Sequence, residues 1–299
     1  MNKKFDFMLM RLLRRLGFEK TAWALRRLNC PVGKEALVLE VGSGGNPYPR
    51  ANVLLDAYES TRERHWAPLV ADRPMVLGFV EDLPFKDKAF DFVIASHVLE
   101  HSADPKKFLS ELQRVAKAGY IETPDAFMER LNPYRDHRLE VTARDGRLEI
   151  NKKSNWNIDP ALLELYEAKA KKWITQSTIP SHPFDFHLRY FWSDNIEFTV
   201  VNDQCDATWQ PPLSERTVAN TLRRNPFRSF LLNVFRKSFS QTPRNRQIDL
   251  LSVLRCPNCQ KSELRQEMKK ITCLSCHSVF CVKNNIPVMY SNTSNEACA

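Results

Sequence analysis

Four cysteines near the C-terminus have the spacing of a metal site. Cys256 and Cys259 form one Cys-x-x-Cys pair, and Cys273 and Cys276 form a second pair after 13 intervening residues. Two such pairs are typical of a tetrahedral, four-thiolate zinc site, which is closed to substrates and stabilises a small fold. Clustering of this kind favours structural zinc in a reducing compartment over a secreted disulfide framework. Two neighbouring side chains are alternative ligands: His277 and Cys281.

A glycine-rich turn over residues 40–47 is a second candidate site. Gly42 and Gly44 would let the backbone approach a ligand closely, although a plain tight turn is the alternative. A dinucleotide fingerprint fits poorly, because Pro47 occupies the position of its third glycine. A ligand without phosphates fits better. Asp56 could then accept both hydroxyls of a ribose, and Glu40 could meet an ammonium group or lie behind it.

The residues around this turn predict strands that alternate with helices. Apolar runs at 36–39, 52–56 and 90–95 predict buried strands, and 119–124 predicts another. Asp104-Pro105 predicts a helix start. This alternation indicates an α/β sheet.

The rest of the chain is divided by changes in its pattern. Residues 125–185 are expected to be an insertion that covers the sheet and forms a substrate pocket. Within it, residues 137–152 predict a hairpin around Asp145-Gly146, and Asp159-Pro160 predicts a helix to about residue 173. The expected domains are a basic helical segment at 1–34, the α/β domain at 35–211, a basic helical linker at 212–250, a cysteine module at 251–290 and a tail at 291–299.

The order of four motifs resembles class I S-adenosylmethionine-dependent methyltransferases over about residues 36–124. These motifs are Val38-Leu39-Glu40-Val41-Gly42-Ser43-Gly44, Leu55-Asp56, Glu81-Asp82-Leu83-Pro84-Phe85, and Phe90 to His101. The resemblance implies a Rossmann-like fold with S-adenosyl-L-methionine as cofactor. It implies that Gly42, Ser43 and Gly44 line the methionine and ribose, that Asp56 holds the ribose hydroxyls, that Asp82 and Leu83 flank the adenine, and that Ser96 and His97 face the sulfonium.

Two features depart from this family pattern. Phe79 stands where many relatives carry an acid that contacts the adenine amine, so a stacking or packing role is expected for it. The segment between the glycine turn and Asp56 is short and contains Pro47 and Pro49, which exclude a long helix there.

Methyl transfer requires alignment of the acceptor and exclusion of water, and it requires a base only where the acceptor must lose a proton. The expected candidates are His97, His101 and Glu122, with His97 and His101 ranked first because strand ends lie near the cofactor crevice. His101 could instead fix its loop, and Glu122 could be a buried, hydrogen-bonded acid. Three histidines of the insertion are further candidates for a base or for a metal site: His137, His182 and His187.

The cysteine module has a resemblance of its own. Leu250 to Pro257 and Ile286-Pro287-Val288-Met289 look like the small zinc ribbons that activate tRNA, rRNA and release-factor methyltransferases. Such proteins bind a methyltransferase domain as a separate partner. Here the ribbon is joined to the domain in one chain, which implies that it packs on that domain.

The positive charge is concentrated in two segments. Residues 1–34 hold nine basic and two acidic residues, residues 212–250 hold eight and two, and the remaining 226 residues sum to −4. Residues 7–16 and 226–239 predict amphipathic helices; the first carries an apolar face of Leu9, Leu12, Leu13 and Leu16. By default these faces pack on the body, and contact with anionic lipid or with RNA phosphates is the alternative. With no apolar stretch of membrane-spanning length and no secretory signal, we expect a cytoplasmic protein, with peripheral membrane contact as an option.

Together these features predict a methyltransferase that moves a methyl group to an oxygen or nitrogen of a small molecule, glycan or lipid-linked acceptor. The body is acidic and the insertion suits a closed pocket, which favours this class. One alternative is a tRNA or protein methyltransferase with a built-in zinc-ribbon activator. Another is a cofactor-binding scaffold without catalysis, which the Phe79 departure motivates.

Overall fold

The computed structural model describes residues 6–64, 66–156, 160–210, 234 and 238–291. The chain forms two compact units. Unit 1 comprises Met1–Pro31, Ala95–Lys106 and Tyr120–Arg216, and unit 2 comprises Val32–Ile94, Lys107–Gly119 and Thr217–Ala299. The predicted helix at 226–239 lies almost wholly outside the described residues.

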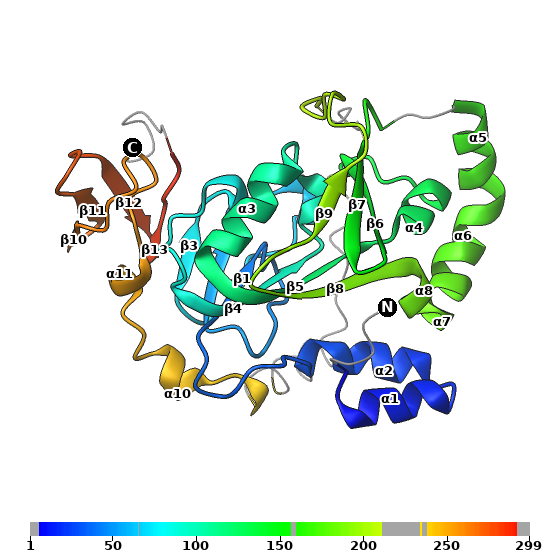
Figure 1. Cartoon of the computed structure of the whole chain (residues 1–299), viewed down its shortest axis with the longest axis horizontal. Coiled ribbons are helices and arrows are strands. Elements are labelled where there is room, and N and C mark those ends of the chain that lie inside the picture. Colours follow the sequence, from blue (N-terminus) through cyan, green and yellow to red (C-terminus); the bar gives the residue numbers. More distant parts are fainter. Residues whose placement is uncertain (1–5, 65, 157–159, 211–233, 235–237, 292–299) are drawn as a thin grey trace. The chain divides into compact units, whose positions relative to one another are not determined.

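A six-stranded sheet has the order β3-β2-β1-β4-β5-β8. Figure 1 labels five of these strands: β1, β3, β4, β5 and β8. Its strands are β1 Val38–Val41, β2 Val53–Asp56, β3 Met75–Leu77, β4 Phe90–Ser96, β5 Ala116–Pro124 and β8 His187–Ser193. Strands β1 to β3 pair in parallel. The strands are short apolar runs that are buried along their length, as expected when both faces of a parallel sheet are covered. The predicted α/β class is confirmed.

Helix α3, Pro105–Val115, has one apolar, buried face. Its Phe108, Leu109, Leu112 and Val115 recur at helical spacing and are fully buried. Strand β3 was not expected, since three residues between polar segments give too short a pattern to recognise.

A second, three-stranded sheet has the order β6-β7-β9, with β6 Leu139–Arg144 and β7 Arg147–Lys152 inside the expected insertion and β9 Phe198–Val200 beyond it. Strands β6 and β7 form the predicted hairpin, whose turn residues Asp145 and Gly146 both have positive φ. The helices of this region are α4 Ala126–Leu131, α5 Pro160–Leu165, α6 Lys171–Trp173, α7 Ile179–Ser181 and α8 Pro183–Phe186, with π-helical turns at Tyr166–Ala170 and Ile174–Thr178.

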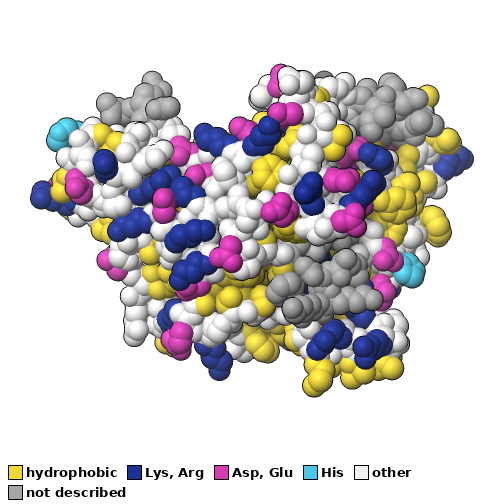
Figure 2. Space-filling model, viewed as in Figure 1, with side chains coloured by type: hydrophobic (Ala, Val, Ile, Leu, Met, Phe, Trp, Pro, Cys, Tyr) yellow, Lys and Arg dark blue, Asp and Glu magenta, His cyan; other side chains and the backbone are white. Residues whose placement is uncertain are grey.

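The N-terminal helices are α1 Met8–Arg15 and α2 Glu19–Leu25, followed by a 3-10 turn at Arg26–Leu28. The expectation that the Leu face of α1 is packed is wrong for most of that face. Met10 is buried against Ala22 and Phe184, whereas Leu9, Leu12 and Leu16 are 49, 51 and 60% exposed. Figure 2 shows hydrophobic side chains along these helices beside Lys and Arg.

The C-terminal module is a four-stranded sheet of order β10-β11-β12-β13. Its strands are β10 Leu264–Glu267, β11 Lys270–Cys273, β12 Val279–Lys283 and β13 Ile286–Pro287, preceded by α10 Thr242–Asn245 and α11 Leu250–Val253. Among the described residues, no helix combines the length and hydrophobicity needed to cross a lipid bilayer.

Candidate active site and metal centre

In unit 2, the glycine turn follows β1 and is tied to β2. Gly42 and Gly44 have φ of 65° and 56°, a conformation that glycine adopts without strain. A side chain at Gly44 would also meet Arg64 Cδ at 3.1 Å. The Ser43 amide donates to the Leu55 carbonyl, while the buried Ser43 Oγ has no hydrogen-bond partner. The turn therefore offers one unsatisfied, buried polar group.

The loop after this turn contains no helix, as Pro47 and Pro49 predicted, and buried polar groups hold it instead. Glu40 accepts a hydrogen bond from the Tyr48 amide at 2.7 Å. The Arg73 guanidinium donates to the carbonyl oxygens of Tyr48, Pro49 and Ala51. Glu40 thus supports the loop in the structure.

Asp56 ends β2, and its carboxylate is already engaged. One oxygen accepts from the Gly44 amide at 2.9 Å, and the other pairs with Arg64 Nη1 at 2.7 Å. The sequence did not single out Arg64, because an arginine in a polar loop carries no distinctive pattern. A ribose that binds at Asp56 would have to share this carboxylate with Arg64 or displace the Arg64 side chain.

Aromatic rings gather beyond β2 and β3. Phe79 lies 5.7 Å from Tyr58 in an edge-on contact and 5.1 Å from Tyr290 in a tilted contact, measured between ring centroids, so in this structure it packs against other aromatic rings. Asp82 ends a short 3-10 turn, Val80–Asp82. The Leu83 amide donates to Glu111 Oε2 at 2.8 Å, so this amide is occupied in the structure.

In unit 1, several side chains converge on Glu122 of β5, which is fully buried. Arg26 forms a bidentate pair with it at 2.8 and 2.9 Å, the Ser96 hydroxyl donates at 3.1 Å, and the Tyr120 hydroxyl donates to its other oxygen. His97 Nε2 lies 3.4 Å away. Burial would raise the pKa of Glu122, but Arg26 and His97 hold it well below its usual value. Glu122 is thus an ionised acid at the centre of a polar cluster.

His97 follows β4 in a left-handed conformation, with φ of 57°, and its amide donates to the Glu122 carbonyl. Its Nδ1 lies 3.2 Å from Glu100 Oε1. Partial burial disfavours the protonated ring and so would lower the pKa of His97. The carboxylates of Glu100 and Glu122 have the larger effect and raise this pKa to about 10. Its side chain is 40% exposed, so a bound molecule can reach it. His97 is therefore a protonated donor at neutral pH.

The other candidate histidines are distributed around this cluster. His187 lies 5.5 Å from His97 between ring centroids, and its Nδ1 faces the Pro183 carbonyl. His101 Nδ1 faces the Asp136 carbonyl, which gives it the loop-fixing contact that the sequence left open. Within the described residues, neither His182 nor His187 belongs to a group with metal-ligand proximity, so the metal set of the three insertion histidines is wrong.

Arg26, Tyr120 and Arg189 are polar residues of this region that the sequence did not identify. Arg26 belongs to a segment whose basic residues suggested surface contact, and Arg189 lies in β8, where it donates to the Tyr120 hydroxyl at 3.0 Å. Only long-range contacts reveal their roles, because 96 and 69 residues separate them from their partners.

The four cysteines of the module lie together. Sγ atoms of Cys256 and Cys276 are 3.6 Å apart, and those of Cys259 and Cys273 are 3.5 Å apart. All four sulfurs lie within 4.8 Å of one another. A tetrahedral zinc ion with Zn–S bonds of about 2.3 Å needs sulfurs about 3.8 Å apart, so this group fits zinc. His277 and Cys281 are not members of the group.

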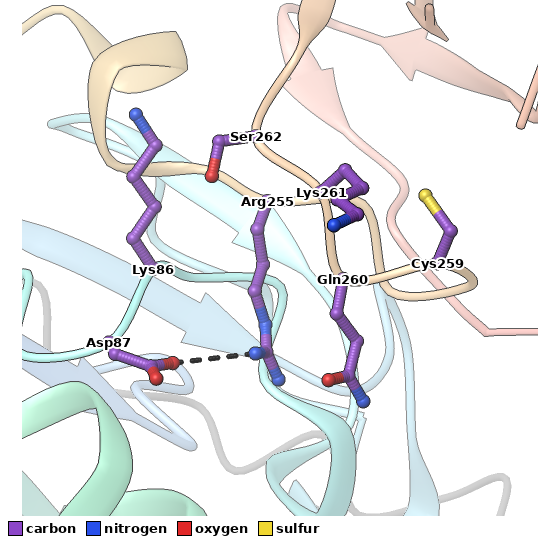
Figure 3. Close-up of a pocket in the computed structure, with 7 residues that line it drawn as sticks. All are labelled: Lys86, Asp87, Arg255, Cys259, Gln260, Lys261 and Ser262. Carbon is purple, nitrogen blue, oxygen red and sulfur yellow. Dashed lines mark hydrogen bonds and ion pairs between the residues drawn. The ribbon is translucent and has the colours of Figure 1, made fainter. Parts of the chain in front are cut away.

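The module contacts strands and loops of unit 2. The backbone of Val288 forms a β-bridge with Leu77 of β3, and the Met289 amide donates to the Leu77 carbonyl. Leu254 forms a second β-bridge with Phe85. A cavity of about 470 Å³ lies at this junction (Figure 3). Its seven lining residues include Arg255, whose guanidinium lies 3.4 Å from Asp87. Of the predicted site residues only Cys259 lines it.

The sheet, with a glycine turn after β1 and an acid at the end of β2, has the arrangement expected from the resemblance to class I methyltransferases. Residues 39–121 match the family described as a methyltransferase domain. This chain therefore contains an S-adenosylmethionine-dependent methyltransferase domain, and the cofactor that follows from this class is S-adenosyl-L-methionine. The α/β fold and the methyltransferase class expected from the sequence are confirmed for this domain.

Individual relatives match only part of the chain. An uncharacterised protein of Methanocaldococcus jannaschii is 54% identical over 45 residues, 15% of this chain and 22% of that protein. Sarcosine/dimethylglycine N-methyltransferase of Aphanothece halophytica is 30% identical over 102 residues, 30% of this chain and 37% of that enzyme. A solved S-adenosylmethionine-dependent methyltransferase from Mesorhizobium loti aligns with 57% of this chain and 96% of its own, at 14% identity and a TM-score of 0.33. The chain thus spans between a fifth and two fifths of the length of these curated relatives.

Proposed function

We propose that this protein transfers the methyl group of S-adenosyl-L-methionine to an oxygen or nitrogen of a small-molecule, glycan or lipid-linked acceptor. The observation that carries this proposal is the polar cluster around Glu122, because a buried, ionised acid with a protonated, reachable His97 can orient and hydrogen-bond a polar acceptor. When bound, the cofactor supplies an activated methyl carbon.

The glycine turn supports cofactor binding. We assign Gly42, Ser43 and Gly44 to the methionine and ribose, Asp56 to the ribose, Asp82 and Leu83 to the adenine, and Ser96 to the sulfonium side, with Glu40 holding the loop. The unpartnered Ser43 Oγ is an observation that fits a polar ligand there. The Phe79 ring offers a stacking surface in place of an acid.

The roles of the catalytic candidates follow from their charge states. His97 carries a proton in the free protein, so it would first donate a hydrogen bond to the acceptor. It could serve as a base only after losing that proton to solvent. Glu122 would keep His97 oriented. His101 is 35 residues from its partner Asp136 and serves to position its loop.

Calorimetry tests the proposal. Titration with S-adenosyl-L-methionine should give one binding site, whereas NAD should give no heat. Asp56→Asn should weaken binding at least tenfold, while Glu63→Gln, an acid in the following loop, should not change it. Silence with S-adenosyl-L-methionine would overturn the proposal. If the protein binds S-adenosyl-L-methionine but methylates nothing in fractionated cell extract, the alternative of a cofactor-binding scaffold without catalysis would be favoured.

For the cysteine group we propose structural Zn²⁺, which the sulfur distances support. Because all four positions of a tetrahedral ion would be filled by thiolates, this ion would do no chemistry on substrates. Its effect would be to hold a ribbon that packs on the methyltransferase domain.

The second candidate is a tRNA or protein methyltransferase with a built-in zinc ribbon. The contact of the ribbon with β3 favours it, since a module that pairs with a sheet edge can act as a permanent subunit. RNA binding would weaken steeply between low and moderate salt, because each phosphate contact releases counterions. Salt-independent activity on small acceptors would support the first candidate.

We also propose that α1 makes peripheral contact with anionic lipid. Leu9, Leu12 and Leu16 are exposed beside the exposed cations Arg11 and Arg15, which is the composition of an interfacial helix.

A further inference from the structure

Two histidines and one carboxylate of unit 1 meet at a place that methyl transfer does not require. Glu100 and His101 lie in the 3-10 turn Leu99–His101 after β4, and His137 lies just before β6. Their ligand atoms are all within 4.8 Å of one another. The two imidazole rings stand nearly perpendicular, with centroids 4.7 Å apart. Metal–nitrogen bonds of about 2.1 Å place tetrahedral ligands about 3.4 Å apart, so side-chain shifts of about 1 Å would complete a common site.

The carboxylate of Glu100 has an unused oxygen. Glu100 is 1% exposed, and its Oε1 faces His97, whereas Oε2 is buried without a hydrogen-bond partner in the described structure. Leaving such an oxygen unpaired is costly, because it has lost its water and gained no donor. A bound cation would satisfy it.

The two histidines are held as metal ligands usually are. His137 Nδ1 lies 2.6 Å from Glu129 Oε2, and the buried Glu129 is held in turn by Lys153 Nζ at 2.7 Å. His101 Nδ1 faces the Asp136 carbonyl at 3.1 Å. A carbonyl can only accept, so Nδ1 of His101 carries a proton, and in the neutral ring Nε2 then has the lone pair that a metal would use. A metal-binding histidine typically donates its other ring N–H to a carboxylate or a carbonyl in this way.

We propose that Glu100, His101 and His137 bind one divalent first-row transition ion. Two imidazoles and one carboxylate form a ligand set that suits Zn²⁺, Fe²⁺ and their neighbours. Three protein ligands leave coordination positions for water or a bound molecule, in contrast to the closed cysteine group. Glu129 is a positioning residue for His137. The proposal does not depend on methyl transfer.

Cobalt substitution of the full chain separates the two centres. We expect two Co²⁺ ions per chain by elemental analysis: one with thiolate-to-metal charge-transfer absorption and one without. Glu100→Gln should remove the second ion and leave the thiolate signal intact. Glu140→Gln changes another buried acid of unit 1 and should retain both ions. Glu129→Gln should weaken the second site by about 10- to 100-fold.

Either of two results would overturn the proposal: one ion per chain in the unaltered protein, or two ions in Glu100→Gln. Because the thiolate signal reports an intact ribbon, circular dichroism is needed to show that unit 1 remains folded. If Glu100→Gln does not fold, His137→Gln gives the same test, and retention of the second ion in that variant would equally contradict the proposal.

Discussion

At the scale of single residues, charge pairing dominates unit 1. Glu122 is ionised, fully buried and surrounded by Arg26, His97 and two hydroxyl groups. A buried charge is tolerated only when it is paired in this way, and removal of one partner leaves the other uncompensated. The cluster therefore makes the stability of the fold depend on pH.

Glu122→Gln tests this dependence. The pKa of Glu122 is lowered on folding, so its carboxylate stabilises the protein above the unfolded pKa of about 4.3, and that contribution is lost as the pH falls through the lower folded value. We expect the free energy of unfolding of the variant to be about 3 kcal/mol lower than that of the unaltered protein at pH 7. This difference between the two proteins should narrow below about pH 4. Urea unfolding at a series of pH values measures it. A gap that does not change with pH would contradict the assignment.

At the scale of elements, the chain connects β1 to β2 through a loop without a helix. Its backbone carbonyls are satisfied by one buried side chain, Arg73, rather than by helical hydrogen bonds. Pro47 and Pro49 account for the missing helix, but nothing in the sequence pattern linked Arg73 to this loop. The residue lies more than 20 positions away, immediately before β3.

Arg73→Gln should therefore loosen the glycine turn without touching a ligand. We expect the free energy of unfolding to fall by about 2 kcal/mol, since buried carbonyls would lose charged donors, and affinity for S-adenosyl-L-methionine to fall in calorimetry. Arg265→Gln, an exposed arginine of β10, is the control. Unchanged affinity in a destabilised Arg73→Gln protein would show that the loop does not shape the cofactor site.

Helix α1 supplies a second prediction at this scale. Leu12→Glu with Leu16→Glu should reduce sedimentation with phosphatidylglycerol vesicles more than about tenfold, because two exposed apolar side chains lose their burial in lipid. Leu165→Glu, an exposed leucine of α5, is the matched control. Equal binding to phosphatidylcholine vesicles, or no binding by the unaltered protein, would refute anionic-lipid contact.

At the scale of the whole chain, the cysteine module contacts the strand β3 and the segment that follows it. Val288 and Met289 of the module contact Leu77 of β3. Leu254 contacts Phe85 in the segment after β3. Tyr290 also donates its hydroxyl to the Ala57 carbonyl, one residue beyond Asp56. A loss of metal is thus expected to reach beyond the ribbon.

Removal of zinc by a chelator should lower the melting temperature and release one thiolate-bound ion, because metal binding supplies folding free energy for small modules. Cys259→Ser should behave like the chelated protein, and Cys205→Ser, a cysteine outside the group, should behave like the unaltered one. Differential scanning fluorimetry with metal analysis measures both. An unchanged melting temperature after complete removal would show that the ribbon folds without zinc.

Sequence alone determined the features that depend on local pattern. The α/β class follows from apolar runs separated by helix starts, the hairpin from Asp145-Gly146, and the cysteine group from its two Cys-x-x-Cys pairs. The methyltransferase class follows from motifs in a fixed order between residues 38 and 101. Each motif that carries one of these signals is only a few residues long.

Tertiary structure alone decided which polar groups meet. Arg26 and Glu122, Arg73 and the loop carbonyls, and His137 beside Glu100 are partners separated by long stretches of chain. It also decided that Leu9, Leu12 and Leu16 remain exposed, although their helical spacing resembles that of a buried face. The physical reason is that periodicity and spacing report local backbone geometry, whereas ion pairing, burial and metal proximity depend on how distant segments pack.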